Sequence, residues 1–158
     1  MDATDLIVRG GHVFDGTGGA PFEADIAIRN GRIATVGRCD GPAAEVIDAK
    51  GMMVTPGFID VHTHYDGQLI WSENLSPSSA HGVTTVVTGN CGVGFAPCRP
   101  ADRRKLIKLL EGVEDMPEVV LAEGLTWDWE TFPEFIDALE RRRHDIDYAV
   151  QLPHAALR

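Results

Sequence analysis

The first 55 residues carry short runs in which apolar and polar side chains alternate. A period of two is typical of β-strands that bury one face, so these runs predict strands. The strands are expected at Leu6–Val8, which can continue at His12–Phe14, and at Asp25–Arg29, Arg32–Val36 and Val46–Ala49. Asn30-Gly31 is a strong short signal for a hairpin turn. We therefore expect a small antiparallel sheet or half-sandwich without a helix.

The pattern changes after Gly57, where short apolar runs alternate with longer amphipathic ones. The apolar runs predict strands at Phe58–His62, Thr84–Thr88 and Tyr148–Leu152. The amphipathic runs predict helices near Asp102–Glu111 and Phe132–Arg143. Strands that alternate with helices are typical of α/β units, so we expect parallel strands in this part of the chain.

Several features near these helices have structural explanations. Thr131 can cap the second helix at its start. The run Arg141–Arg143 suits the negative end of a helix dipole, so we interpret it as a solvated helix end and not as a nucleic-acid patch. Trp127 and Trp129 could cover a substrate cleft, but tryptophans usually serve as packing anchors, and we interpret them so.

Gly57–Asp66 combines an apolar strand face with two imidazoles. On a strand that runs through this segment, Phe58, Asp60, His62 and His64 point to one side. Neutral imidazole is the commonest metal ligand, and two imidazoles at the end of one strand can meet a single cation. The alternative is a pair of exposed or hydrogen-bonded histidines. The preceding Pro-Gly break and the apolar opposite face favour the metal-ligand interpretation.

Cys91 lies in a glycine-rich turn directly after the predicted strand Thr84–Thr88. Ligands bind at the carboxyl ends of parallel strands, and neighbouring strands would bring this cysteine toward His62 and His64. A thiolate and two imidazoles are suitable zinc ligands. A small buried thiol in a tight turn is the alternative. Cys39 and Cys98 are interpreted as ordinary thiols.

Composition and charge narrow the classes of partner. The chain has 158 residues, of which 24 are acidic and 14 basic, and a net charge of -10. This balance argues against electrostatic capture of nucleic acid or an anionic membrane. The acidic start does not resemble a secretory signal, and three cysteines are too few for a disulfide scaffold. These features predict a cytoplasmic protein.

At this point the motifs resemble a known family. Thr55–His64, reading Thr-Pro-Gly-Phe-Ile-Asp-Val-His-Thr-His, is similar to the first barrel strand of the amidohydrolase superfamily, and the upstream strands resemble its N-terminal β-sandwich segment. Gly89-Asn90-Cys91-Gly92 resembles the narrower N-acyl-D-amino-acid deacylase (D-aminoacylase) branch, in which a cysteine after the second strand is a metal ligand. The resemblance runs along essentially the whole chain.

The resemblance also implies roles for individual residues. Cys91 would hold a tight zinc ion, while His62 and His64 would belong to a second, weaker metal position. Asp60 would orient one of these histidines from behind, or it is a buried structural aspartate. His154 would reach the cleft, or it is an ordinary loop histidine. The family also needs two further histidines and a catalytic general-base aspartate, which we expect beyond the last residue of this chain.

The fold that the resemblance implies is α/β. It is a metal-dependent (β/α)8 (TIM) barrel of roughly 250 residues, preceded by a small β-sandwich. Residues 1–55 would be the N-terminal β-sandwich segment, and residues 56–158 would be the first strands and helices of an incomplete barrel. The chain would then be an N-terminal fragment, with open barrel edges through which it could self-associate.

The implied activity is hydrolysis of the linear amide C–N bond of a small-molecule N-acyl-D-amino acid, with one or two Zn²⁺ ions as cofactor. One alternative is a cyclic amidohydrolase similar to dihydropyrimidinase, which would use a carboxylated lysine from a later strand. The other alternative is a catalytically inactive truncated fragment that takes up zinc without turnover.

Overall fold

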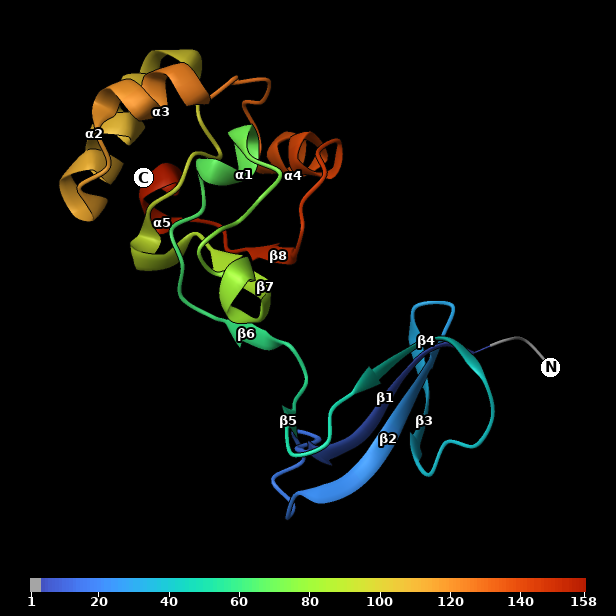
Figure 1. Ribbon diagram of the computed structural model, residues 1–158. Helices are drawn as coiled ribbons and strands as arrows, with labels where there is room; N and C mark the ends of the chain where they lie inside the picture. The colour runs from blue at the N-terminus through green and yellow to red at the C-terminus, as the bar shows by residue number, and fades with distance from the viewer. Residues whose placement is uncertain (1–3) are drawn as a thin grey trace. The chain divides into compact units, whose positions relative to one another are not determined.

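The computed structural model describes residues 4–158 and separates the chain into two compact units, which divide between Pro56 and Gly57 (Figure 1). Residues 4–56 form strands without a helix, whereas residues 57–158 mix strands and helices. Within residues 4–158, no helix combines the length and the apolar character needed to cross a bilayer.

The first unit is a five-stranded sheet in the order β3-β2-β1-β4, with β5 paired to β1. The strands are β1 (Thr4–Val13), β2 (Phe22–Arg29), β3 (Arg32–Gly37), β4 (Ala43–Asp48) and β5 (Met53–Val54). The predicted hairpin is confirmed, because β2 and β3 pair antiparallel and Asn30 and Gly31 take φ angles of 50° and 68°. β1 is one strand with an irregularity between Val8 and Gly11, where the sequence suggested two pieces.

The expectation of an antiparallel sheet is wrong for two strands, because β4 and β5 run parallel to β1. The loop after β3 is held by Asp25, whose carboxylate accepts hydrogen bonds from the backbone N–H groups of Cys39 (3.1 Å) and Gly10 (2.9 Å). These bonds hold the pKa of Asp25 below its usual value. The alternation of apolar and polar side chains indicates which face a strand buries, but it does not indicate whether the neighbouring strand runs parallel or antiparallel. The sequence pattern therefore could not predict this pairing.

The second unit is built on a three-stranded parallel sheet in the order β6-β7-β8, which confirms the predicted parallel strands. Its strands are β6 (Phe58–Asp60), β7 (Val83–Thr88) and β8 (Asp147–Val150). Its α-helices are α1 (Gln68–Trp71), α2 (Arg103–Glu114), α3 (Glu118–Gly124), α4 (Phe132–Glu140) and α5 (His154–Leu157). Three short 3₁₀ turns are η1 (Ser79–His81), η2 (Asn90–Gly92) and η3 (Pro100–Asp102). The chain therefore has a mixed α/β fold.

The helices differ from the predictions mainly in number and in where they end. The pattern did not predict α1, α3 or α5, because helices of four to seven residues are too short to show a clear period. The predicted cap of α4 is confirmed: the Glu134 N–H donates to the Thr131 hydroxyl, and the Thr131 N–H donates to the Glu134 carboxylate at 2.8 Å.

The interpretation of the arginine run as a solvated helix end is wrong for Arg142. Helix α4 ends at Glu140, and the chain then turns so that the Arg142 guanidinium faces back into the unit. It donates to the Ile70 carbonyl oxygen at 3.0 Å and to the Thr126 hydroxyl at 3.1 Å, and it pairs with Asp128 at 3.4 Å. Arg142 therefore ties the end of α4 to α1 and to the segment before the helix.

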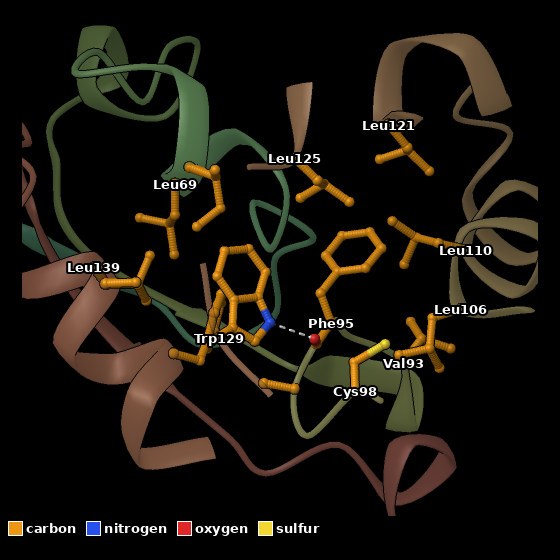
Figure 2. Close-up of a cluster of buried hydrophobic side chains, with 14 of the residues drawn as sticks. Leu69, Val93, Phe95, Cys98, Leu106, Leu110, Leu121, Leu125, Trp129 and Leu139 are labelled. Atoms are coloured by element: carbon orange, nitrogen blue, oxygen red, sulfur yellow. Dashed lines mark hydrogen bonds between the residues drawn. The ribbon is translucent and has the colours of Figure 1, made fainter. Parts of the chain in front are cut away.

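Trp129 is central to the core of the second unit, as Figure 2 shows. It is 3% exposed, and its indole N–H donates to the Phe95 carbonyl oxygen at 2.8 Å. One fully buried leucine from each of four helices contributes to the same cluster: Leu69, Leu110, Leu121 and Leu139. Trp127 packs partly buried against the cluster. The interpretation of both tryptophans as packing residues is confirmed.

Candidate metal centre

Two neighbouring parallel strands bring the candidate ligands to one edge of the second sheet. The predicted strand Phe58–His62 is shorter than expected and ends at Asp60, so His62 and His64 lie on the loop after β6. Thr63 between them is buried, and both its N–H (3.0 Å) and its hydroxyl (2.8 Å) donate to the Val87 carbonyl oxygen on β7. This double contact holds the histidine loop against β7.

Cys91 lies in the loop after β7, inside η2, and takes the left-handed φ of 53°. The loop is held from both sides. The Asp66 carboxylate accepts a hydrogen bond from the Gly89 N–H at 2.8 Å. The Asn90 side-chain amide donates to the Val87 carbonyl oxygen at 2.8 Å and accepts from the Gln151 side chain at 2.9 Å. These contacts place a strained cysteine at a defined position.

The three candidate ligands converge, although the histidines follow one strand and the cysteine another. The Cys91 Sγ atom lies 3.4 Å from His62 Nε2 and 3.6 Å from His64 Nε2. One ligand atom from each residue lies within 4.8 Å of the others. Cys91 and His62 are exposed and His64 is half-buried, so solvent reaches the group. Cys39 and Cys98 are buried and lie outside this group.

These distances and donor types suit a zinc ion. With bonds of roughly 2.0–2.1 Å to nitrogen and 2.3 Å to sulfur, a nitrogen and a sulfur on one tetrahedral ion lie roughly 3.5–3.6 Å apart. Both observed nitrogen–sulfur distances, 3.4 and 3.6 Å, are close to this spacing. Two imidazoles and one thiolate also bind zinc in preference to hard cations such as Mg²⁺ or Ca²⁺, which favour oxygen ligands. The three side chains could therefore hold such an ion with little rearrangement.

The other residues singled out from the sequence take different places. Asp60 is half-buried, and its carboxylate accepts a hydrogen bond from the backbone N–H of His62 at 3.2 Å, so it contacts the backbone of this residue. His154 is exposed at the start of α5 and is not in the ligand group. Its backbone lies beside Gly92, in the cysteine loop.

Two carboxylates near the centre were missed by the sequence analysis. Glu114, the last residue of α2, has its Oε1 atom 3.1 Å from His64 Nε2. Asp66 is 2% exposed, and burial raises its pKa to about 7. The sequence signal for Asp66 was its place two residues after the second histidine. Glu114 gave no such signal, because it is 50 positions from His64 and belongs to an acidic run that resembles a solvated turn.

A cavity of about 950 Å³ lies in another part of the second unit. It is lined by residues of η3, α2 and α5, such as Leu106, and by the segment before η3, which includes Cys98 and Arg99. It contains none of the three candidate ligands, so it does not contribute to the metal centre.

Gly89→Ala is expected to lower the free energy of unfolding by about 1–3 kcal/mol. Gly89 has a φ of 81°, and an added Cβ atom would collide with the carbonyl oxygen of Gln151. The collision would displace the loop that carries Cys91, so zinc affinity should fall as well. Urea unfolding and a zinc titration of the same variant check both effects.

Gly112→Ala is the matched control for this prediction. Gly112 is exposed on α2, and an added Cβ atom would meet nothing within 4 Å. Because alanine favours a helix by about 0.5–1 kcal/mol over glycine, this variant should be slightly more stable and should bind zinc normally. Equal effects of the two substitutions would contradict the role given to Gly89.

Comparisons with known proteins agree with the family resemblance seen in the sequence. Residues 45–158 match a sequence profile described as the amidohydrolase family. D-aminoacylase of Alcaligenes xylosoxydans xylosoxydans is 36% identical over 155 residues, which cover 98% of this chain and 30% of that protein. The chain therefore spans about a third of the length of this relative.

Two solved structures resemble the chain closely. N-acyl-D-glutamate deacylase of Bordetella bronchiseptica was solved with zinc and a phosphonate that mimics the tetrahedral intermediate. It matches with a TM-score of 0.80 and 35% identity, over 99% of this chain and 31% of that one. A D-aminoacylase with a binuclear metal centre matches with a TM-score of 0.76 and 35% identity, over 98% of this chain and 30% of that one.

Proposed function

The chain belongs to the amidohydrolase family, and we propose that it forms the metal-binding part of a zinc-dependent N-acyl-D-amino-acid deacylase. The substrate class would be small N-acyl amino acids, and the bond cleaved would be their linear amide C–N bond. The similarity to D-aminoacylase and to N-acyl-D-glutamate deacylase over nearly the whole chain supports this assignment. The expected preference for the D-enantiomer of the substrate is inferred from these relatives.

One observation carries the proposal: Cys91 lies within ligand distance of both histidines. A thiolate in this position supports the deacylase branch over the cyclic amidohydrolases, which the sequence analysis expects to use a carboxylated lysine from a later strand. The geometry thus favours a linear amide as the substrate.

His62, His64 and Cys91 would hold the zinc. Bound zinc would supply a Lewis acid that polarises the amide carbonyl and lowers the pKa of a water molecule. The other residues of the chain position these ligands: Asp60 holds the backbone of His62, and Asn90 holds the cysteine loop against β7. The aspartate that would move the proton, and the further histidines that the resemblance implies, are not among these residues.

We also propose that residues 1–55 are the β-sandwich segment and residues 56–158 the first strands and helices of a (β/α)8 barrel. The parallel order β6-β7-β8 and the position of the ligands at the carboxyl ends of strands support this architecture.

We propose a cytoplasmic location as well. The three cysteines are free, which suits a reducing compartment.

Exposed apolar residues at β6 support the proposal that the chain self-associates. Phe58, Ile59 and Val61 are 58%, 63% and 67% exposed. In a complete barrel, neighbouring strands and helices would cover such side chains. Without that cover, apolar strand residues at a sheet edge favour pairing with another chain.

Zinc content and hydrolysis measured on the same sample test the proposed function. We expect the purified chain to take up zinc and to leave N-acetyl-D-glutamate, N-acetyl-D-leucine and their L-enantiomers intact, because the aspartate that the resemblance implies would lie beyond Arg158. D-selective hydrolysis would support the activity and show that the 158 residues suffice. Failure to take up zinc, or hydrolysis of a cyclic amide such as dihydrouracil, would overturn the proposal.

A further inference from the structure

We propose that Asp66 is a positioning residue of the metal centre, which keeps Cys91 at ligand distance from the two histidines without binding the metal itself. This inference rests on the proposed function, because it concerns the same centre. Asp66 is not in the group of convergent ligand atoms, so it acts through the loop at residues 89–94, which carries the cysteine.

Both ends of this loop meet one oxygen atom of Asp66. At its start, the buried Gly89 donates its N–H to Asp66 Oδ1 at 2.8 Å. At its end, Gly94 approaches so closely that an added Cβ atom would lie 3.1 Å from the same oxygen. Cys91 lies between these two glycines and takes a left-handed φ of 53°. The loop therefore folds around the Asp66 carboxylate, and the position of its cysteine depends on that contact.

The segment that carries Asp66 also carries His64, two positions earlier. This segment is fixed by contacts of its own. The Tyr65 hydroxyl donates to the Ser78 hydroxyl at 3.0 Å and accepts from the Ser78 N–H at 3.2 Å. The Tyr65 carbonyl oxygen accepts from the Leu69 N–H at 2.9 Å. A carboxylate on a fixed segment thus sets the separation between the histidines and the cysteine.

Burial makes this contact hard to replace. Asp66 is 2% exposed and Gly89 is buried, so water does not readily supply another acceptor. A buried N–H group without a partner is costly, so the loop would shift if the acceptor were removed. Within residues 4–158, the second carboxylate oxygen, Oδ2, is buried and has no hydrogen-bond partner. One oxygen therefore makes the positioning contact, and an amide side chain at this position still supplies it.

A cobalt titration of the purified chain, of Asp66→Ala and of Asp66→Asn tests the inference. Co²⁺ replaces zinc at such sites, and a thiolate-to-cobalt absorption band reports ligation by Cys91. We expect Asp66→Ala to bind Co²⁺ at least about 10-fold more weakly and to lose most of the thiolate band, because its loop no longer holds the cysteine near the histidines. Asp66→Asn keeps the acceptor oxygen, so it should bind close to the unmodified chain and retain the band.

Asp145→Ala is the matched control. The Asp145 carboxylate also accepts a hydrogen bond from a backbone N–H group, that of the buried Leu75, at 2.9 Å. Asp145 precedes β8, at the amino end of the sheet, and is not in the ligand group. The variant loses a similar contact away from the centre, so it should keep both Co²⁺ affinity and the thiolate band. Loss of the band in this variant as well would contradict a specific role for Asp66.

The outcomes separate the two proposals. If the unmodified chain shows the thiolate band and Asp66→Ala matches it in affinity and spectrum, the inference is wrong and the centre itself stands. The inference is also wrong if Asp66→Asn loses the band as fully as Asp66→Ala. If the unmodified chain shows no thiolate band, the proposed metal centre is wrong and the inference falls with it.

A further variant covers loss of folding. Should Asp66→Ala lose its far-ultraviolet helix signal, Asp66→Glu is measured instead. It keeps the carboxylate but displaces the oxygen by one methylene group in a buried site, so the affinity and the thiolate band should both fall. An unchanged affinity and band in this variant would contradict the positioning role.

Discussion

Cys91→Ala is expected to abolish stable zinc binding by this chain. The Cys91 Sγ atom lies close to both histidines, 3.4 Å from His62 Nε2 and 3.6 Å from His64 Nε2. In structural zinc sites an apparent binding free energy of about 10–16 kcal/mol is shared among about four ligands, or about 2.5–4 kcal/mol for each, so losing one should weaken binding roughly 70- to 1000-fold. Elemental analysis after gel filtration and a competitive chelator titration measure the effect.

Cys39→Ala is the control for this experiment. Cys39 is also a free thiol, but it is buried in the first unit and is not part of the ligand group. Its substitution removes one sulfur from the chain without touching the centre, so zinc stoichiometry should not change. Equal zinc loss in both variants would point to nonspecific thiol binding, and unchanged zinc affinity in Cys91→Ala would refute the assigned site.

Trp129→Ala is expected to lower the free energy of unfolding by about 3–5 kcal/mol, the largest stability effect that we predict. The indole is 3% exposed, lies 4.9 Å from the Phe135 ring between centroids, and satisfies the Phe95 carbonyl oxygen with its N–H. The substitution leaves a large cavity and a buried carbonyl group without its partner. Urea unfolding followed by circular dichroism measures the loss.

Two further variants make this result interpretable. Trp71→Ala removes the same side chain from a position that is 40% exposed, so it should cost clearly less. Trp129→Phe keeps much of the ring but loses the N–H donor, and it should fall between the unmodified chain and Trp129→Ala. If Trp71→Ala were as destabilising as Trp129→Ala, the central packing role of Trp129 would be wrong.

The sequence predicted the candidate ligands because their chemistry is local. Two histidines flank one threonine directly after an apolar strand, and a cysteine sits among glycines after the next strand. Parallel strands place such segments at one edge whatever else the chain does. The error in this reasoning was local too: the strand ends at Asp60, so the histidines are presented by a loop and the period of two does not orient them.

The residues that support the centre were not predictable in this way. Asp66 holds the cysteine loop through Gly89, and Glu114 reaches His64 from the end of α2. Each contact joins residues 23 or more positions apart and depends on how a helix or a loop packs on the sheet. The same limit explains Arg142, whose partners Ile70, Thr126 and Asp128 lie on α1 and on the segment before α4.

The sequence by itself determined the alternation of elements in each half of the chain, the Asn30-Gly31 hairpin, the cap at Thr131 and the identity of three candidate metal ligands. These features depend on side-chain periodicity and on the backbone preferences of single residues, which act over a few positions. Only the tertiary structure decided that β4 and β5 run parallel to β1, which short helices form, and that Glu114 lies beside His64. These outcomes depend on packing between distant segments, and no local pattern of residues records which segments will meet.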